Sequence, residues 1–136
     1  MAAPFHPYED FDMNPVISWF EIPTADFERG IRFYETVLEV SLRREDMGPM
    51  HMAIFPGEMD APSGGAVIHM AGGNPPGPMG TVIYLFGGDD LAVPLARVEA
   101  AGGQVLVPKT LITPEIGYFA VFCDCEGNHV GLYSMH

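Results

Sequence analysis

Apolar positions along the chain change between strand-like and helix-like spacing, and the same order of spacings occurs twice. Residues 16–22 are rich in β-branched and aromatic side chains, which is typical of a strand. Asp26 follows at a position suited to a helix N-cap. Apolar residues then recur at helical spacing on one face, at Phe27, Ile31, Tyr34 and Leu38. Three further strands are expected, over residues 40–45, 50–55 and 65–71.

A Gly- and Pro-rich segment, residues 72–80, separates this pattern from its repeat. The first three helical positions of the first half recur 64 residues later, as Leu91, Leu95 and Val98. A period of this length is typical of a duplicated module rather than of a solenoid repeat. Two copies of one module form a paired sheet with a cleft between its halves, and such clefts hold small molecules.

The second half is expected to follow the same plan. Residues 81–86 read as a strand, and the helix after it should begin late, near Ala92 or Val93. Pro94 causes this delay, because proline lacks a backbone donor and clashes with the preceding helical turn. The helix should then continue to Ala101. The last three strands are expected over residues 104–111, 117–123 and 129–134.

These elements predict an α+β fold of two paired β-α-β-β-β modules. The modules would together form a curved eight-stranded mixed sheet around a cleft. The predicted division is an N-terminal arm over 1–13, a first module over 14–71, a hinge over 72–80 and a second module over 81–136.

Composition narrows the classes of partner. Apolar residues make up 48% of the 136 residues and charged residues 18%, which is typical of a globular chain. The net charge is −12, and the six Lys and Arg residues do not cluster, so a nucleic-acid partner is not expected. The acidic balance either keeps the protein in solution or steers a cationic ligand.

The beginning of the chain and its cysteines indicate the compartment. Residues 1–13 contain Asp and Glu and lack a long apolar run, so neither a signal peptide nor a membrane partner is expected. Cys123 and Cys125 are one residue apart, and a bridge between them would close a strained ring. Free thiols favour a reducing compartment, and we expect a cytoplasmic protein.

Three local motifs, in this order and spacing, resemble the vicinal oxygen chelate superfamily. The motifs are Glu-Ile-Pro at 21–23 with Asp-Phe-Glu-Arg at 26–29 and Phe-Tyr at 33–34, Ala-Ala-Gly-Gly at 100–103 with Pro-Lys-Thr at 108–110, and Asp-Cys-Glu-Gly-Asn-His-Val-Gly-Leu at 124–132. This superfamily holds glyoxalase I, extradiol dioxygenases and the fosfomycin and bleomycin resistance proteins. The chain looks most like its uncharacterised glyoxalase-like bacterial branch.

The resemblance also implies four positions for metal ligands, two in each module. Carried onto this sequence, they are Ile17, His69, Thr81 and Gly131. Catalytic metal sites typically use three protein ligands, and of these four residues His69 alone is a credible one. We therefore expect no bound cofactor at the family's positions, although a divalent metal at a rearranged site stays open.

Strand alternation predicts which side chains line the cleft. If Ile17 and Gly131 point inward, the neighbours two residues along each strand do too, and His69 and Thr81 join them as family positions. The predicted ligand-binding cleft comprises Ile17, Trp19, Glu21, His69, Thr81, His129, Gly131 and Tyr133. Glu21 and His69 are the candidate catalytic groups. The alternatives are a core role for Trp19, a paired or exposed Glu21, a neutral hydrogen-bonded His69 and a solvent-facing His129.

Three functions follow from this cleft. The first is a metal-independent small-molecule protein, either a binder or an enzyme of unassigned activity. The second is sequestration of a cationic toxin or drug, as in the bleomycin-resistance relatives, with Trp19, Tyr133 and Glu21 holding the cation. The third is a divalent-metal-dependent lyase, isomerase or dioxygenase, in which Glu21 and His129 or a partner chain complete a site around His69.

The resemblance implies a homodimer as well, and a two-fold pair is the commonest homo-oligomer. The hinge at 72–80 is long enough for the modules to pair within a chain or to exchange between chains. The apolar residues 4–8 of the arm would then lie across the neighbouring chain.

Overall fold

The computed structural model describes residues 16–57 and 64–136 of the chain. The predicted arm over 1–13 lies outside the described residues. Within the described residues, neither helix has the length and hydrophobicity needed to cross a bilayer.

The first half of the chain forms one four-stranded sheet with the order β1-β4-β3-β2. Strand β1 pairs with β4 in parallel, and the other neighbours are antiparallel. A helix, α1, connects β1 to β2. The elements are β1 (Trp19–Pro23), α1 (Phe27–Leu38), β2 (Arg43–Met47), β3 (Met50–Ile54) and β4 (Gly64–His69).

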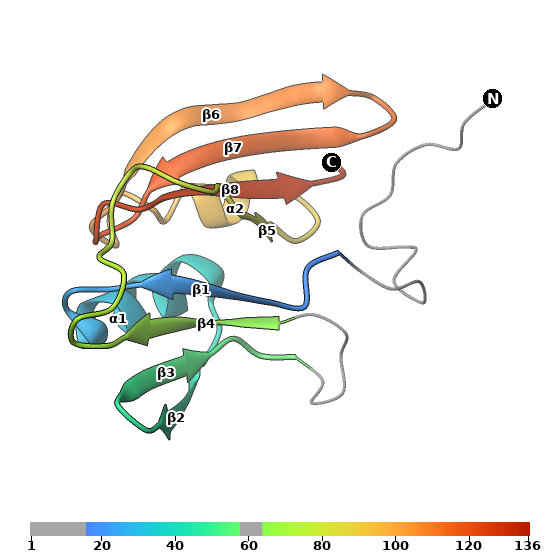
Figure 1. Cartoon of the computed structure of the whole chain (residues 1–136). Helices are drawn as coiled ribbons and strands as arrows, with labels where there is room; N and C mark the ends of the chain where they lie inside the picture. The colour runs from blue at the N-terminus through green and yellow to red at the C-terminus, as the bar shows by residue number, and fades with distance from the viewer. Residues whose placement is uncertain (1–15, 58–63) are drawn as a thin grey trace.

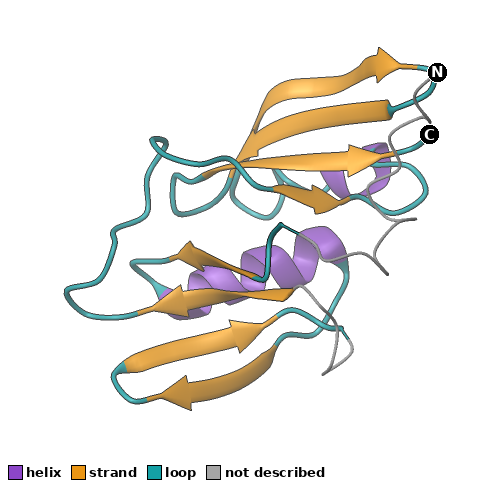
Figure 2. Ribbon diagram, turned by 45° about the vertical axis from the view of Figure 1, so that its right-hand side comes forward, coloured by secondary structure: helices purple, strands orange, loops and turns teal. Residues whose placement is uncertain are grey.

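The second half repeats this topology with the order β5-β8-β7-β6, and β5 pairs with β8 in parallel. The elements are β5 (Tyr84–Phe86), α2 (Ala92–Leu95), β6 (Gln104–Thr113), β7 (Gly117–Cys123) and β8 (His129–Ser134). Figures 1 and 2 show the two sheets next to each other, with β1 and β5 on the edges that face one another. The predicted fold of two β-α-β-β-β modules with eight strands is therefore confirmed for the described part of the chain.

Helix α1 forms where the apolar stripe predicts it. The Asp26 carboxylate accepts a hydrogen bond from the Arg29 backbone N–H at 3.1 Å and so caps the first turn. Glu39 ends the helix in the left-handed conformation, with φ of 53°. The residues buried along the helix are Gly30, Ile31, Phe33, Tyr34 and Val37.

The second helix is shorter than predicted. Regular α-helix covers Ala92–Leu95 and does not continue to Ala101, and the chain passes through turns instead. After Leu95 two backbone hydrogen bonds span three residues instead of four: the Arg97 N–H donates to the Pro94 carbonyl at 3.0 Å and the Val98 N–H to the Leu95 carbonyl at 3.2 Å.

Three strands begin later than predicted. Strand β1 begins at Trp19 instead of residue 16, β2 at Arg43 instead of 40 and β5 at Tyr84 instead of 81. Before β2, the Leu42 N–H donates to the Glu35 carboxylate at 2.9 Å, which holds this stretch against α1 instead of in the sheet.

One hydrophobic core joins the two modules through α1. The rings of Phe33 and Tyr34 in α1 lie 5.8 and 6.4 Å from the ring of Phe122 in β7. Ile22 of β1 and Leu132 of β8 belong to the same buried cluster. Because this shared core lies on the helix side of both sheets, the relative position of the facing edges of β1 and β5 is fixed.

Candidate functional site

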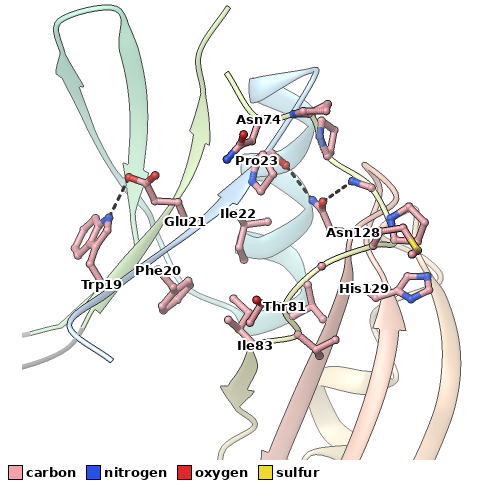
Figure 3. A pocket seen from close by; sticks show the side chains of 18 of the residues that line it. Trp19, Phe20, Glu21, Ile22, Pro23, Asn74, Thr81, Ile83, Asn128 and His129 are labelled. Carbon is pink, nitrogen blue, oxygen red and sulfur yellow. Dashed lines mark hydrogen bonds between the residues drawn. The ribbon is translucent and has the colours of Figure 1, made fainter. Parts of the chain in front are cut away.

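A pocket of about 760 Å³ lies along the free edge of β1. Its other walls are the segment that connects the modules, the residues before β5 and the start of β8 (Figure 3). A volume between about 300 and 1,000 Å³ is usual for small-molecule sites. The lining residues are Ile17, Trp19, Phe20, Glu21, Ile22, Pro23, residues 74–83, Asn128, His129 and Val130.

Trp19 and Glu21 lie side by side on the β1 wall, since residues two apart on a strand share a face. The Trp19 indole N–H donates to a Glu21 carboxylate oxygen at 3.2 Å (Figure 3). The Trp19 side chain is still 44% exposed, and Glu21 is exposed too. This pair therefore offers a ligand an aromatic face next to a negative charge.

Asn128 fixes the opposite corner of the pocket. Its amide nitrogen donates to the Pro23 carbonyl at 2.9 Å, and its amide oxygen accepts from the Gly77 N–H at 2.9 Å (Figure 3). Asp124 accepts from the same amide nitrogen at 3.0 Å. One side chain thus connects the end of β1, the connecting segment and the turn before β8.

The turn that contains Asn128 also holds the start of α1. The Glu126 carboxylate accepts from the backbone N–H groups of Ala25 and Asp26 at 3.0 and 3.1 Å. It also pairs with the Arg29 guanidinium at 3.1 Å, and the Glu126 side chain is only 2% exposed. The motif at 124–132 therefore contributes to the connection between the modules.

Five of the eight residues predicted for the cleft line this pocket. They are Ile17, Trp19, Glu21, Thr81 and His129. The prediction missed the wall formed by the connecting segment, and it missed Asn128. The Gly and Pro content of residues 72–80 indicated a flexible hinge, but not that residues 74–80 fold over the pocket.

His69 lies on the other face of the first sheet. Val67, which shares the face of His69, belongs to the core under α1, whereas Ala66 pairs with Glu21. The His69 Nδ1 atom lies 2.9 Å from the Thr24 carbonyl oxygen. The predicted orientation of His69 toward the cleft therefore differs from the structure.

Gly131 and Tyr133 do not line the pocket either. A Cβ atom at Gly131 would overlap the ring of Tyr84, its cross-strand neighbour, so that ring covers the glycine. Tyr133 is 8% exposed, and its hydroxyl donates to the Ile116 carbonyl. Tyr133 therefore acts as a buried connection to the turn between β6 and β7 and does not line the pocket.

The four family metal positions do not fit a metal ion in this geometry. Ile17 has no ligating atom, Gly131 lies under an aromatic ring and His69 is on the opposite face. Of these four residues, Thr81 alone brings a side-chain oxygen to the pocket. Over residues 16–57 and 64–136, no three His, Cys, Asp or Glu side chains are grouped to hold an ion.

The two cysteines do not act as nucleophiles here. Both are free thiols. Burial, and then the Asp124 carboxylate, raise the pKa of Cys125 to about 11, and the same causes raise the pKa of Cys123. Since the thiolate is the reactive form, both side chains stay protonated and unreactive near neutral pH.

Comparison with known proteins decides the family. The family model described as Glyoxalase/Bleomycin resistance protein/Dioxygenase superfamily matches residues 16–132, most of the chain. The chain belongs to this superfamily. The expected resemblance is therefore confirmed at the level of family and fold.

Solved structures of the superfamily share the fold at low sequence identity. Glyoxalase I from Zea mays superposes with a TM-score of 0.65 at 20% identity, over 87% of this chain and 45% of that one. The antibiotic binding protein TnmS3 from Streptomyces sp. CB03234 gives 0.62 at 23% identity, over 88% and 95%. A glyoxalase/bleomycin resistance protein from Albidiferax ferrireducens T118 gives 0.62 at 16% identity, over 88% and 98%.

The chain thus spans a little under half the length of the maize enzyme and nearly the full length of the two bacterial proteins. Comparison with curated protein sequences gives no match. At these identities the structural likeness establishes the fold, and the activity has to be argued from the pocket.

Proposed function

We propose that this protein binds a small molecule in the pocket along β1 and does so without a metal ion. One observation carries the proposal: the exposed Trp19–Glu21 pair forms a wall of a pocket of about 760 Å³. A metal-dependent reaction has less support, because the residues at the family's metal positions do not converge on the pocket.

The chemistry of this wall favours a cationic ligand with a flat or apolar body. A cation over an indole ring gains about 0.5–2 kcal/mol. The Glu21 carboxylate lies within hydrogen-bond reach of that indole, and the net charge of −12 attracts cations over longer distances. The apolar body of the ligand would pack on Ile17 and on the prolines of the connecting segment.

Sequestration of a cationic antibiotic or toxin is the specific form of this function that we favour. The structural likeness to an antibiotic binding protein supports it. Thr81 and His129 are the remaining polar side chains on the walls besides Asn128 and Asn74. They would orient the ligand through hydrogen bonds.

Tryptophan fluorescence tests this proposal directly, because Trp19 is the single tryptophan of the chain. We expect a cationic glycopeptide to change the emission of Trp19 in a saturable way. Unchanged emission together with no heat of binding by calorimetry would refute the proposal.

Two substitutions test the contribution of the Glu21 charge to ligand binding. Glu21→Gln should weaken binding of the cationic ligand about 2–5-fold, because an exposed ion pair contributes about 0.5–1 kcal/mol. An uncharged analogue should bind Glu21→Gln and parent equally well. Glu99→Gln removes the same charge from an exposed position outside the pocket and serves as the matched control.

Assembly as a homodimer is a second part of the proposal. Large apolar side chains are exposed on the second sheet, including Tyr84 at 49%, Leu111 at 49% and Ile112 at 42%. Light scattering on the full-length chain and on a chain that begins at Met13 tests both the dimer and the role of the arm. A monomeric mass of the full-length chain at micromolar concentration would refute the dimer.

A further inference from the structure

The ligand pocket meets the backbone edge of a strand rather than the face of a sheet. Five consecutive residues of β1, from Trp19 to Pro23, line it, although successive side chains of a strand point to opposite faces. A run without alternation lines one pocket only where that pocket touches the edge of the strand. Among the strands that the structure describes, β1 pairs with β4 alone, so its other edge faces the pocket (Figure 3).

Two hydrogen bonds show which backbone groups of β1 point to this edge. In a strand, the N–H and C=O of one residue point to the same side, and the side alternates along the chain. The Thr24 N–H donates to the Ile68 carbonyl of β4 at 2.9 Å, so the groups of Thr24 point into the sheet. The Pro23 carbonyl points the other way and accepts from the Asn128 side chain at 2.9 Å. By the same alternation, the N–H and C=O of Glu21 point into the pocket.

The Asn128 side chain already binds this edge as a neighbouring strand would. Its amide carries the donor and the acceptor of a peptide bond: it donates to the Pro23 carbonyl and accepts from the Gly77 N–H at 2.9 Å. The next outward position along β1 is Glu21. Over residues 16–57 and 64–136, no side chain or loop donates to or accepts from the Glu21 backbone.

A chain of secondary amides complements the edge at Glu21. Each amide offers one N–H and one C=O, and addition of a strand to an exposed sheet edge is a usual mode of peptide binding. A ligand residue beside Glu21 would place its side chain on the face that carries Trp19 and Glu21. A cationic side chain there reaches both the indole ring and the carboxylate, which are themselves joined by a hydrogen bond of 3.2 Å.

We propose that the ligand of this pocket is peptide-like: an extended chain of secondary amides with a cationic side chain, which pairs with the edge of β1 at Glu21. This inference rests on the proposed function and narrows the class of its ligand. Three residues of such a chain extend about 10 Å. The Asn128 amide ends the pairing at Pro23, so the ligand pairs with the edge before that position.

The amides of a synthetic ligand provide the first test. The probe is acetyl-Ala-Lys-Ala-amide, titrated into the full-length protein and followed by the emission of Trp19. We expect saturable binding, and binding of butylammonium, which has the cation without amides, at least about 5-fold weaker. N-methylation of one amide at a time should give an alternating pattern, because alternate N–H groups of a paired strand face the edge. The amides that face β1 should lose at least about 5-fold in affinity, and the others should stay within about 2-fold of the unmodified probe.

A matched pair of variants tests the protein side of the same contact. Glu21→Ala and Glu21→Pro both lose the carboxylate, but only the proline also loses the N–H. Proline is tolerated on an edge strand where the N–H faces away from the sheet. We expect Glu21→Pro to bind the probe at least about 3-fold more weakly than Glu21→Ala does. Circular dichroism and thermal melts on both variants check that the fold is retained.

Amide hydrogen exchange of the parent protein gives a readout that needs no variant. Saturation with the probe should slow exchange at Glu21, while the amides of Phe20 and Ile22, which face β4, change little. Equal effects of all N-methyl groups, or unchanged exchange at Glu21 with the probe bound, would overturn the pairing with β1. If the probe does not bind but a cationic glycopeptide does, the peptide-like ligand is wrong and the proposed function stands. If neither binds, both are wrong.

Discussion

Replacement of Tyr34 by Phe removes one hydroxyl from the buried connection between the two modules. The Tyr34 hydroxyl donates to the Asp124 carboxylate at 2.7 Å, and the Tyr34 side chain is 1% exposed. The substitution leaves the ring, and therefore its contacts with Phe33, Phe55 and Phe122, in place. The measured change in stability therefore reports this one hydrogen bond.

The magnitude follows from what Asp124 retains. Its carboxylate still accepts from the backbone N–H groups of Glu126 and Asn128, at 2.8 and 2.9 Å, and from the Asn128 amide at 3.0 Å. Loss of a hydrogen bond to a charged group costs about 1.5–3 kcal/mol. For a domain of this size, about 3–4 °C of melting temperature is lost per kcal/mol, so we expect a decrease of about 5–12 °C.

Thermal melts and urea unfolding of parent and variant measure this change. Tyr84→Phe is the matched control, because it removes a hydroxyl from a tyrosine that is 49% exposed and should change stability by less than about 0.5 kcal/mol. If Tyr34→Phe and Tyr84→Phe melt within 2 °C of each other (about 0.5 kcal/mol), the hydrogen bond to Asp124 does not stabilise the contact between the modules.

Three further predictions concern the same contact. Burial, and then the Asp124 carboxylate, raise the pKa of Tyr34 well above 10, so the unfolded state loses this proton first. The free energy of unfolding should therefore fall as pH rises above about 10, by up to about 1.4 kcal/mol per pH unit. The part of this fall that is due to Tyr34 should be absent from urea titrations of Tyr34→Phe. Glu126→Ala leaves the N–H groups before α1 unpaired and should cost about 1–3 kcal/mol, with faster amide exchange at the start of α1. Gly103→Ala should cost about 1–3 kcal/mol by calorimetry, because its Cβ would lie 2.5 Å from the Cys123 carbonyl oxygen and 2.8 Å from the Phe33 ring; an unchanged melting temperature would contradict this packing.

Local patterns predicted the elements well, because each of them depends on residues close together in the sequence. The α1 stripe at Phe27, Ile31 and Tyr34 recurs at helical spacing, so the helix can be read from the spacing alone. Phe33 and Val37 are buried beside this stripe and were not part of the prediction. The order of the eight described strands and two helices followed from the same reading. The end of α2 was missed because the apolar spacing continues to Val98 while the backbone hydrogen bonds after Leu95 change to three-residue spacing.

The face of β4 could not be read in this way. Ala66, Val67 and Ile68 are all buried, since one face of the strand lies under α1 and the other packs on β3 residues such as Met52. Alternation is visible only where one face is polar, and an error of one residue reverses every side chain. His69 was placed in the cleft as a family position, and the apolar run of β4 gave no alternation that could have corrected this placement. The assignment of Trp19 and Glu21 agrees with the pocket lining.

The polar side chains of the turn at 124–128 hold the modules and the pocket wall in place. Variants of this turn therefore cannot test ligand binding separately from stability. Asp124 binds Tyr34, Glu126 binds the start of α1, and Asn128 binds both Pro23 and the connecting segment. A substitution in this turn moves the modules and the pocket wall together, so it should change stability and ligand affinity at once. Trp19 and Glu21 are exposed on one strand, and their loss should change ligand affinity with little effect on stability. Only variants of the second kind therefore report on the function of the pocket.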